Sequence, residues 1–164
     1  MEQLLTAKII CLIFASGPPD FWLSEYRQDL VCKQASTVIE ESAKNDVDPS
    51  LLLALITVES NWKRTAVSSA NACGLTQVIP KYTGNITKRY TCEQLKRPKT
   101  SIKAGAKILA WWIKYHNGNI TSALCGYNAG FRCGKNRKRP SKGGMRYARK
   151  VLKMQKTIKR LSKQ

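Results

Sequence analysis

The stretch from Asp48 to Trp62 constrains the fold more than any other part of the sequence. Asp48 can cap a helix, Pro49 suits a first helical turn, and the residues that follow are largely apolar. Counting in helical steps places five side chains on one stripe that should face the core: Leu52, Leu55, Ile56, Glu59 and Trp62. A buried carboxylate is costly unless it has a role, so Glu59 needs an explanation.

Two interpretations of Glu59 follow from the sequence. At the edge of the stripe, its carboxylate would reach water or pair with Lys63, four residues further on. Enclosed instead by Leu55, Ile56 and Trp62, the carboxyl would lose solvation, its pKa would rise, and it would donate a proton near neutral pH. A proton donor of that kind is what cleavage of a glycosidic bond requires at the leaving oxygen.

The rest of the chain predicts a mainly α-helical domain, without an internal repeat or a convincing strand pattern. Further helices are expected over residues 24–45, 101–115, 120–129 and 145–161. Residues 63–99 are rich in Ser, Thr, Asn and Gly, with Pro80 and Pro98 as expected stops. This segment is therefore predicted to form loops with at most short elements.

The N-terminal segment 1–17 is expected to be separate from the domain, which would occupy residues 18–164. Lys8 precedes an apolar run from Ile9 to Ala15, and small residues follow, so the segment resembles a secretory signal. The alternative is an uncleaved amphipathic or buried tail, because Glu2 stands where a signal is normally positive. The apolar run is too short to span a bilayer, and no other stretch is expected to cross a membrane.

Six cysteines without paired CxxC spacing favour disulfides over a zinc site, and hence an oxidising compartment. The preferred pairs are Cys73 with Cys92 and Cys125 with Cys133, because each closes a short loop, although spacing alone does not settle connectivity. Removal of Cys11 with a signal would leave one free thiol. No metal or other cofactor is expected, since the chain has a single histidine.

The charge balance identifies the kinds of partner to expect. The chain has 29 Lys and Arg against 10 Asp and Glu, for a net charge of +19, and no acid follows Glu93. Such a chain will bind polyanions. The basic region from Phe131 to Gln164 has 14 Lys or Arg but only two aromatics, so nucleic acid is not expected and anionic wall polymers are the simpler partner.

The shortage of acids also constrains the chemistry of Glu59. Most glycosidases pair the acid with a second carboxylate roughly 5 to 9.5 Å away. Asp46 and Asp48 precede the helix that carries Glu59, so they lie about two or more turns away from Glu59. Glu93 lies in a loop next to Cys92. The sequence therefore indicates a mechanism in which the substrate supplies its own nucleophile.

Four motifs, taken in order, resemble the soluble lytic transglycosylase family, the lysozyme-like enzymes that cut peptidoglycan glycan strands. They are ALITVESNW, GLTQVIP, IKAGAKIL and GYNAG, and the resemblance covers residues 45–152. It implies a lysozyme-like helical fold with a cleft and a single catalytic glutamate matching Glu59. In the family this acid protonates the bond between N-acetylmuramic acid and N-acetylglucosamine, and the muramyl C6 hydroxyl then closes a 1,6-anhydro ring.

The resemblance also implies roles for five further residues. Ser60 matches the residue that helps to orient the acid, Gln77 a glutamine in the cleft, and Tyr127 and Asn128 the pair that holds the sugar and the catalytic side chain. Tyr147 resembles a tyrosine that hydrogen-bonds the acid. From the residues alone, Gln77 could equally bond its own loop.

The chain also departs from the family pattern in three places. Thr76 stands where the family usually has Met, Gly126 stands where Ala is common, and no Glu-Thr pair precedes Tyr147. The first departure puts a contact in the cleft in doubt, and the third puts the role of Tyr147 in doubt.

These observations predict a secreted, periplasmic or virion-associated lytic transglycosylase that acts on peptidoglycan, as a monomer or as part of a virion or secretion assembly. The compact, strongly basic chain favours an enzyme that a bacteriophage uses for entry or lysis. The alternatives are a hydrolytic muramidase of the same fold and a catalytically inactive cationic protein that binds wall or nucleic acid.

Overall fold

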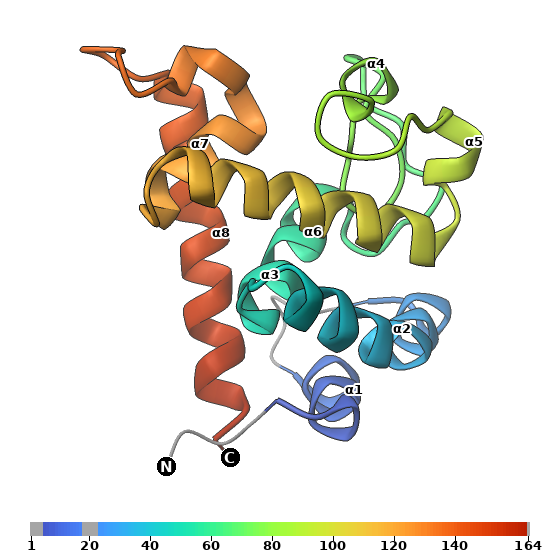
Figure 1. Ribbon diagram of the computed structural model, residues 1–164. Helices are drawn as coiled ribbons and strands as arrows, with labels where there is room; N and C mark the ends of the chain where they lie inside the picture. Colours follow the sequence, from blue (N-terminus) through green and yellow to red (C-terminus); the bar gives the residue numbers. More distant parts are fainter. Residues whose placement is uncertain (1–4, 18–22, 164) are drawn as a thin grey trace.

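Helix α3, Pro49–Ser60, lies at the centre of a helical arrangement (Figure 1). The computed structural model describes residues 5–17 and 23–163. The other helices are α1 Ala7–Ser16, α2 Glu25–Lys44, α4 Pro80–Thr83, α5 Cys92–Leu95, α6 Pro98–Tyr115, α7 Ile120–Ala129, the 3-10 turn η2 Gly130–Cys133 and α8 Lys142–Leu161. No strand forms within the described ranges, so the predicted mainly α-helical class is confirmed.

Two long helices pack against α3. Helix α8 runs along one side of it, α2 packs against it from another, and α6 crosses α2 and continues into α7 (Figure 1). Eight consecutive residues of α3, Ser50 to Thr57, are buried, so no face of the helix is exposed to solvent over two turns. The predicted apolar stripe was therefore too narrow, because neighbouring helices cover α3 on all sides.

The end of α3 differs from the sequence expectation in a way that matters for Glu59. The helix stops at Ser60, and Asn61 and Trp62 both adopt positive φ angles of 46° and 61°. Left-handed backbone at a bulky residue is unfavourable, and burial of the Trp62 ring offsets that cost. Trp62 thus leaves the helix stripe, packs edge-on against Phe14 and donates a hydrogen bond of 3.1 Å to Thr57.

The two prolines expected as stops begin helices instead. Pro98 is in the first turn of α6, which therefore starts at residue 98 rather than 101, and Pro80 begins the short helix α4. Proline suits a first turn, because the first helical N–H groups have no intrahelical partner. The segment between α3 and α6 otherwise has only short elements, as predicted.

The loop segment between α3 and α6 has a small core of its own. Val78, Tyr90 and Leu95 are buried together with Ala104 of α6, and the Cys73–Cys92 disulfide ties the two ends of the segment. This lobe lies beside α6, at the end of α6 that is remote from α7 (Figure 1). The loop that follows Glu59 is therefore held firmly.

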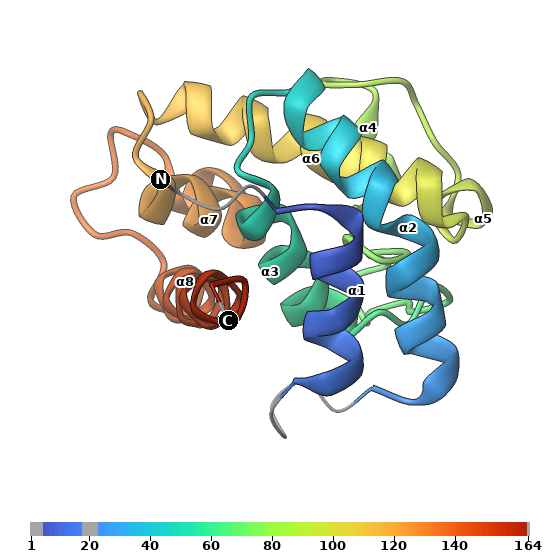
Figure 2. The same ribbon diagram turned by 90° about the horizontal axis from the view of Figure 1, so that it is seen from below.

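Three disulfides form, and two of them are the predicted pairs, Cys73–Cys92 and Cys125–Cys133. The third joins Cys11 of α1 to Cys32 of α2. Helix α1 lies alongside α2 (Figure 2) and buries Ile10, Ile13 and Phe14 in the main core. With Cys11 present, no free thiol remains among the described cysteines.

The packing of α1 is the arrangement expected of a buried tail. The predicted boundary between residues 17 and 18 falls at segment 18–22, which lies outside the described residues. Among the described helices, none combines the length and the apolar character that crossing a membrane requires.

Candidate active site

Glu59 lies in the last turn of α3, where the helix emerges from the core. Glu59 is only partly exposed, and its Oε1 atom accepts a hydrogen bond of 2.6 Å from the Tyr147 hydroxyl of α8. The short distance is typical of an O–H donor on a carboxylate. Helix α8 thus contributes to the enclosure of Glu59 through Tyr147. The sequence expectation, which named only Leu55, Ile56 and Trp62, did not include this helix.

The environment of Glu59 raises the pKa of its carboxyl group from 4.5 to about 7. Loss of solvation is the largest cause, while the Tyr147 hydrogen bond and the positive charge of Lys150 act in the opposite direction. No ion pair involves Glu59 in the described part of the chain, so the predicted alternative of pairing with Lys63 is not realised. A carboxyl with this pKa is partly protonated at neutral pH, as a general acid must be.

Two tyrosines from different helices line the same site. Tyr127 of α7 donates a hydrogen bond of 2.8 Å to the main-chain oxygen of Thr76, in the loop beyond α3. Burial, together with the charge of Glu59, raises the pKa of both Tyr127 and Tyr147 well above 10. Both phenols therefore stay neutral hydrogen-bond donors beside the acid.

Ser60 and Gln77 hold the loop that forms one wall of this region. The Ser60 hydroxyl donates to the main-chain oxygen of Leu75 at 2.9 Å, rather than to Glu59. The side-chain amide of Gln77 donates to the main-chain oxygens of Gly74 and Ala66, at 3.0 and 3.2 Å. The loop-bonding alternative is thus the one seen for the side-chain nitrogen of Gln77.

Asn128 and Lys150 differ in how they relate to Glu59. Asn128 lies next to Tyr127 near the end of α7 and is exposed. Sequence reasoning missed Lys150, whose charge acts on Glu59. Helical spacing could have found it, because residues three apart share a helix face and Lys150 follows Tyr147 by three.

Among the residues that the structure describes, no second carboxylate acts on Glu59. Asp48 caps the other end of α3, about 16 Å of helix rise away, where it accepts from Ser50 and pairs with Lys159 at 2.7 Å. Glu93 is exposed and pairs with Lys96. Within the described residues, no three His, Cys, Asp or Glu side chains come together as metal ligands would.

Two of the three departures from the family pattern have structural reasons. Thr76 is buried, and its hydroxyl donates to the main-chain oxygen of Ser101 at 2.8 Å, which ties the loop to α6. A methyl group on Gly126 would come within 2.3 Å of the Trp112 ring, so alanine does not fit there. The loop and α7 are thus positioned by contacts that suit the residues present in this chain.

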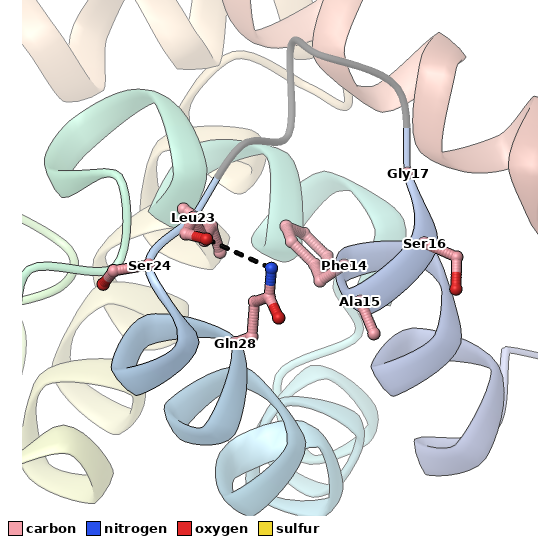
Figure 3. Close-up of a pocket in the computed structure, with 7 residues that line it drawn as sticks. All are labelled: Phe14, Ala15, Ser16, Gly17, Leu23, Ser24 and Gln28. Carbon is pink, nitrogen blue, oxygen red and sulfur yellow. Dashed lines mark hydrogen bonds between the residues drawn. The ribbon is translucent and has the colours of Figure 1, made fainter.

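The hollow in Figure 3 belongs to a different part of the molecule. It lies between α1 and the start of α2, where Gln28 donates to the main-chain oxygen of Leu23 at 3.1 Å. Its lining also includes Phe14 and Ser24. Glu59 does not line it, so this hollow is separate from the candidate active site.

The fold and the site are those of a lysozyme-like helical domain with one protonatable glutamate at the end of a buried helix. Residues 36–148 match the Transglycosylase SLT domain. The match covers more than half of the chain, and the chain belongs to this soluble lytic transglycosylase family.

Individual relatives agree with that assignment. The endo-type membrane-bound lytic murein transglycosylase A of Cronobacter sakazakii is 31% identical over 113 residues, which are 62% of this chain and 56% of that protein. The protein of the same name from Salmonella paratyphi B is 29% identical over the same shares. The chain spans about half the length of the curated relatives it matches.

Solved structures show the same fold. An inactive mutant of the lytic transglycosylase Slt from Pseudomonas aeruginosa aligns with a TM-score of 0.65 at 24% identity, over 73% of this chain and 23% of that one. The 70 kDa soluble lytic transglycosylase Slt70 of Escherichia coli aligns with a TM-score of 0.66 at 17% identity, over 92% of this chain and 29% of that one. At these identities the likeness establishes the fold alone.

Proposed function

We propose that this domain is a peptidoglycan lytic transglycosylase that cleaves the β-1,4 bond between N-acetylmuramic acid and N-acetylglucosamine. One observation carries the proposal: a single glutamate, Glu59, has a pKa of about 7 and no second carboxylate beside it in the described part of the chain. The relatives named as lytic murein transglycosylases support the same substrate class.

The proposed reaction uses Glu59 twice. Its protonated carboxyl gives a proton to the glycosidic oxygen, and the bond from that oxygen to the muramyl C1 breaks. The carboxylate then takes the proton of the muramyl C6 hydroxyl while O6 bonds to C1, which closes the 1,6-anhydro ring. Glu59 returns to its protonated form, and no water is consumed.

The absence of a partner carboxylate near Glu59 among residues 5–17 and 23–163 supports substrate assistance over hydrolysis. A retaining or inverting glycosidase needs its second carboxylate within roughly 10 Å of the acid. Asp48, at the far end of α3, is too distant by about 6 Å or more along the helix axis. The C6 hydroxyl of the substrate fills the role that this missing group would have.

The other site residues receive proposed roles from their positions. Tyr147 would keep the acid oriented through its hydrogen bond, and Tyr127 would hold the loop and present its ring to the sugar. Ser60 would act indirectly, by fixing the loop at the end of α3. Gln77 would accept from a sugar hydroxyl or N-acetyl group through its side-chain oxygen, and Asn128 would bond the sugar from its exposed position.

The setting of this reaction is proposed from the disulfides. Three disulfides suit an oxidising compartment, such as the periplasm or the outside of the cell, where peptidoglycan is also found. We propose that the enzyme opens the wall locally. Bacteriophage entry or lysis, or the passage of a secretion machine, would be its occasion.

The products of wall digestion test the proposal. Purified walls digested by the protein should release muropeptides that end in 1,6-anhydro rings, which mass spectrometry finds lighter by one water than hydrolysed ends. Glu59→Gln should abolish release while the protein still binds the wall. Hydrolysed ends would instead identify a muramidase of the same fold, and unchanged digestion by the Glu59→Gln protein would remove Glu59 from the mechanism.

A further inference from the structure

Six cations form a continuous row on α8. The row, called here the basic row, consists of Lys142, Arg146, Arg149, Lys153, Lys156 and Arg160, and all six residues are exposed. Their spacing alternates between four and three residues, which keeps side chains on one side of a helix with a drift of only about 20° per seven residues. At ~1.5 Å of rise per residue, the row extends for about 27 Å.

No acid in the described ranges of the chain forms an ion pair with the basic row. Residues 94–164 contain no Asp or Glu, and none of the ion pairs in the described part of the chain includes a member of the row. The ion pair that α8 does make, from Lys159 to Asp48, lies off the row. Like charges three and four residues apart repel one another, so the row weakens the helix unless a ligand neutralises it.

A small hollow lies at the first turns of the basic row. Lys142, Arg146 and Arg149 line it together with Pro140 and Met145. Three cations around an apolar floor can hold one anionic group, and arginine is well suited to phosphate because its guanidinium group bonds two oxygens at once. The row therefore combines one concave site for a single anion with a straight path for the anions that follow.

The surroundings of the row separate three kinds of polyanion. A bilayer requires an apolar face to insert, but the apolar residues Ala148, Val151 and Ile158 of α8 are buried in the protein core. Single-stranded nucleic acid is bound by exposed aromatic rings, yet the one aromatic residue of α8, Tyr147, is bonded to Glu59. These surroundings favour a linear polymer recognised by its charges over an inserted membrane or a stacked single strand.

We propose that the basic row binds the phosphate-bearing anionic polymer of the cell wall and so guides the enzyme along its own substrate. The inference rests on the proposed function, because it takes the wall as the substrate. Tyr147 and the row share α8 but lie on different faces of it, because Tyr147 reaches inward to Glu59 while the row is exposed. The row can therefore hold the polymer on the outer face of the same helix that positions the acid, with phosphates in the hollow and along the helix.

Binding to walls with and without phosphate polymer tests this proposal. The parent protein carries Glu59→Gln, so that walls stay intact and binding is measured independently of cleavage. The row variant adds R149Q, K153Q, K156Q and R160Q, and the matched variant adds K88Q, R89Q, R97Q and K99Q, which are exposed and remove the same charge. Glutamine keeps a good helix propensity, and circular dichroism checks that each protein is folded.

The expected result is a loss of wall binding that occurs only when the row is changed. Binding of the row variant to polymer-bearing walls should be roughly tenfold weaker or more, while the matched variant binds like the parent. Treatment of the walls with hydrofluoric acid, which removes phosphodiester polymer, should weaken binding of the parent protein to the level of the row variant.

Three results would overturn the proposal: equal losses in both variants, no effect of stripping on the parent, or tighter row-dependent binding to duplex DNA or to phosphatidylglycerol vesicles than to walls. Failure of the digestion assay with intact row-dependent binding would count against the proposed reaction alone.

Discussion

Replacing Glu59 by glutamine should make the protein more stable at alkaline pH while removing its activity. Glutamine can still accept the hydrogen bond from Tyr147 through its side-chain oxygen, and it carries no charge to desolvate. The wild-type carboxyl has a pKa of about 7 in the folded state, against 4.5 for an ordinary glutamate. A proton donor of this kind is held in place at the expense of stability.

The size and sign of the effect follow from the two pKa values. Between pH 4.5 and about 7 the folded state binds more protons than the unfolded state, so stability falls as the pH rises through this window. The loss is complete above pH 7 and absent below pH 4.5. At 1.36 kcal/mol for each pH unit, the full penalty is about 3 kcal/mol, or roughly 6–12 °C in Tm for a chain of this size.

Thermal or urea unfolding of both proteins at about pH 4 and about pH 8.5 measures this difference. The Glu59→Gln protein should match wild type at the lower pH and exceed it by about 3 kcal/mol at the higher one. Glu93→Gln serves as the control, because Glu93 is exposed, outside the site and paired with Lys96, so its replacement should give no gain in stability at the higher pH. An equal gain at both pH values, or a loss at the higher pH, would refute the desolvated acid and with it the proton-donor role.

Three further substitutions test the surroundings of the site. Tyr147→Phe removes a hydrogen bond that lowers the pKa of Glu59, so the alkaline limb of the pH–rate profile should move to higher pH while the rate falls by roughly tenfold or more. Tyr127→Phe leaves a main-chain oxygen without its donor and should lower the free energy of unfolding by about 1–2 kcal/mol in urea titrations, and an unchanged midpoint would contradict that hydrogen bond. Gly126→Ala should lower Tm by roughly 4–8 °C, because its methyl group would overlap the Trp112 ring, and a rise in Tm would show that the ring can move.

The sequence by itself determined the fold class and drew attention to Glu59 as a carboxyl on an apolar helix. Local signals were sufficient for this, because helix caps, prolines and apolar spacing act over a few residues. Asp48 caps α3 as predicted, and α7 begins and ends at the predicted residues. The loop-closing pairs Cys73–Cys92 and Cys125–Cys133 also came from spacing. Prolines 80 and 98 were misplaced because the same residue can end one segment and begin a helix.

The environment of Glu59 was decided only by the tertiary structure. Its hydrogen-bond partner, Tyr147, lies 88 residues further along the chain, and Tyr127 reaches a loop 51 residues away. The pKa of a carboxyl depends on how much water the surrounding elements exclude, and helix periodicity says only which side faces inward. The left-handed turn at Asn61 and Trp62 likewise needed the packing of Trp62 against α1, since local propensity alone disfavours it.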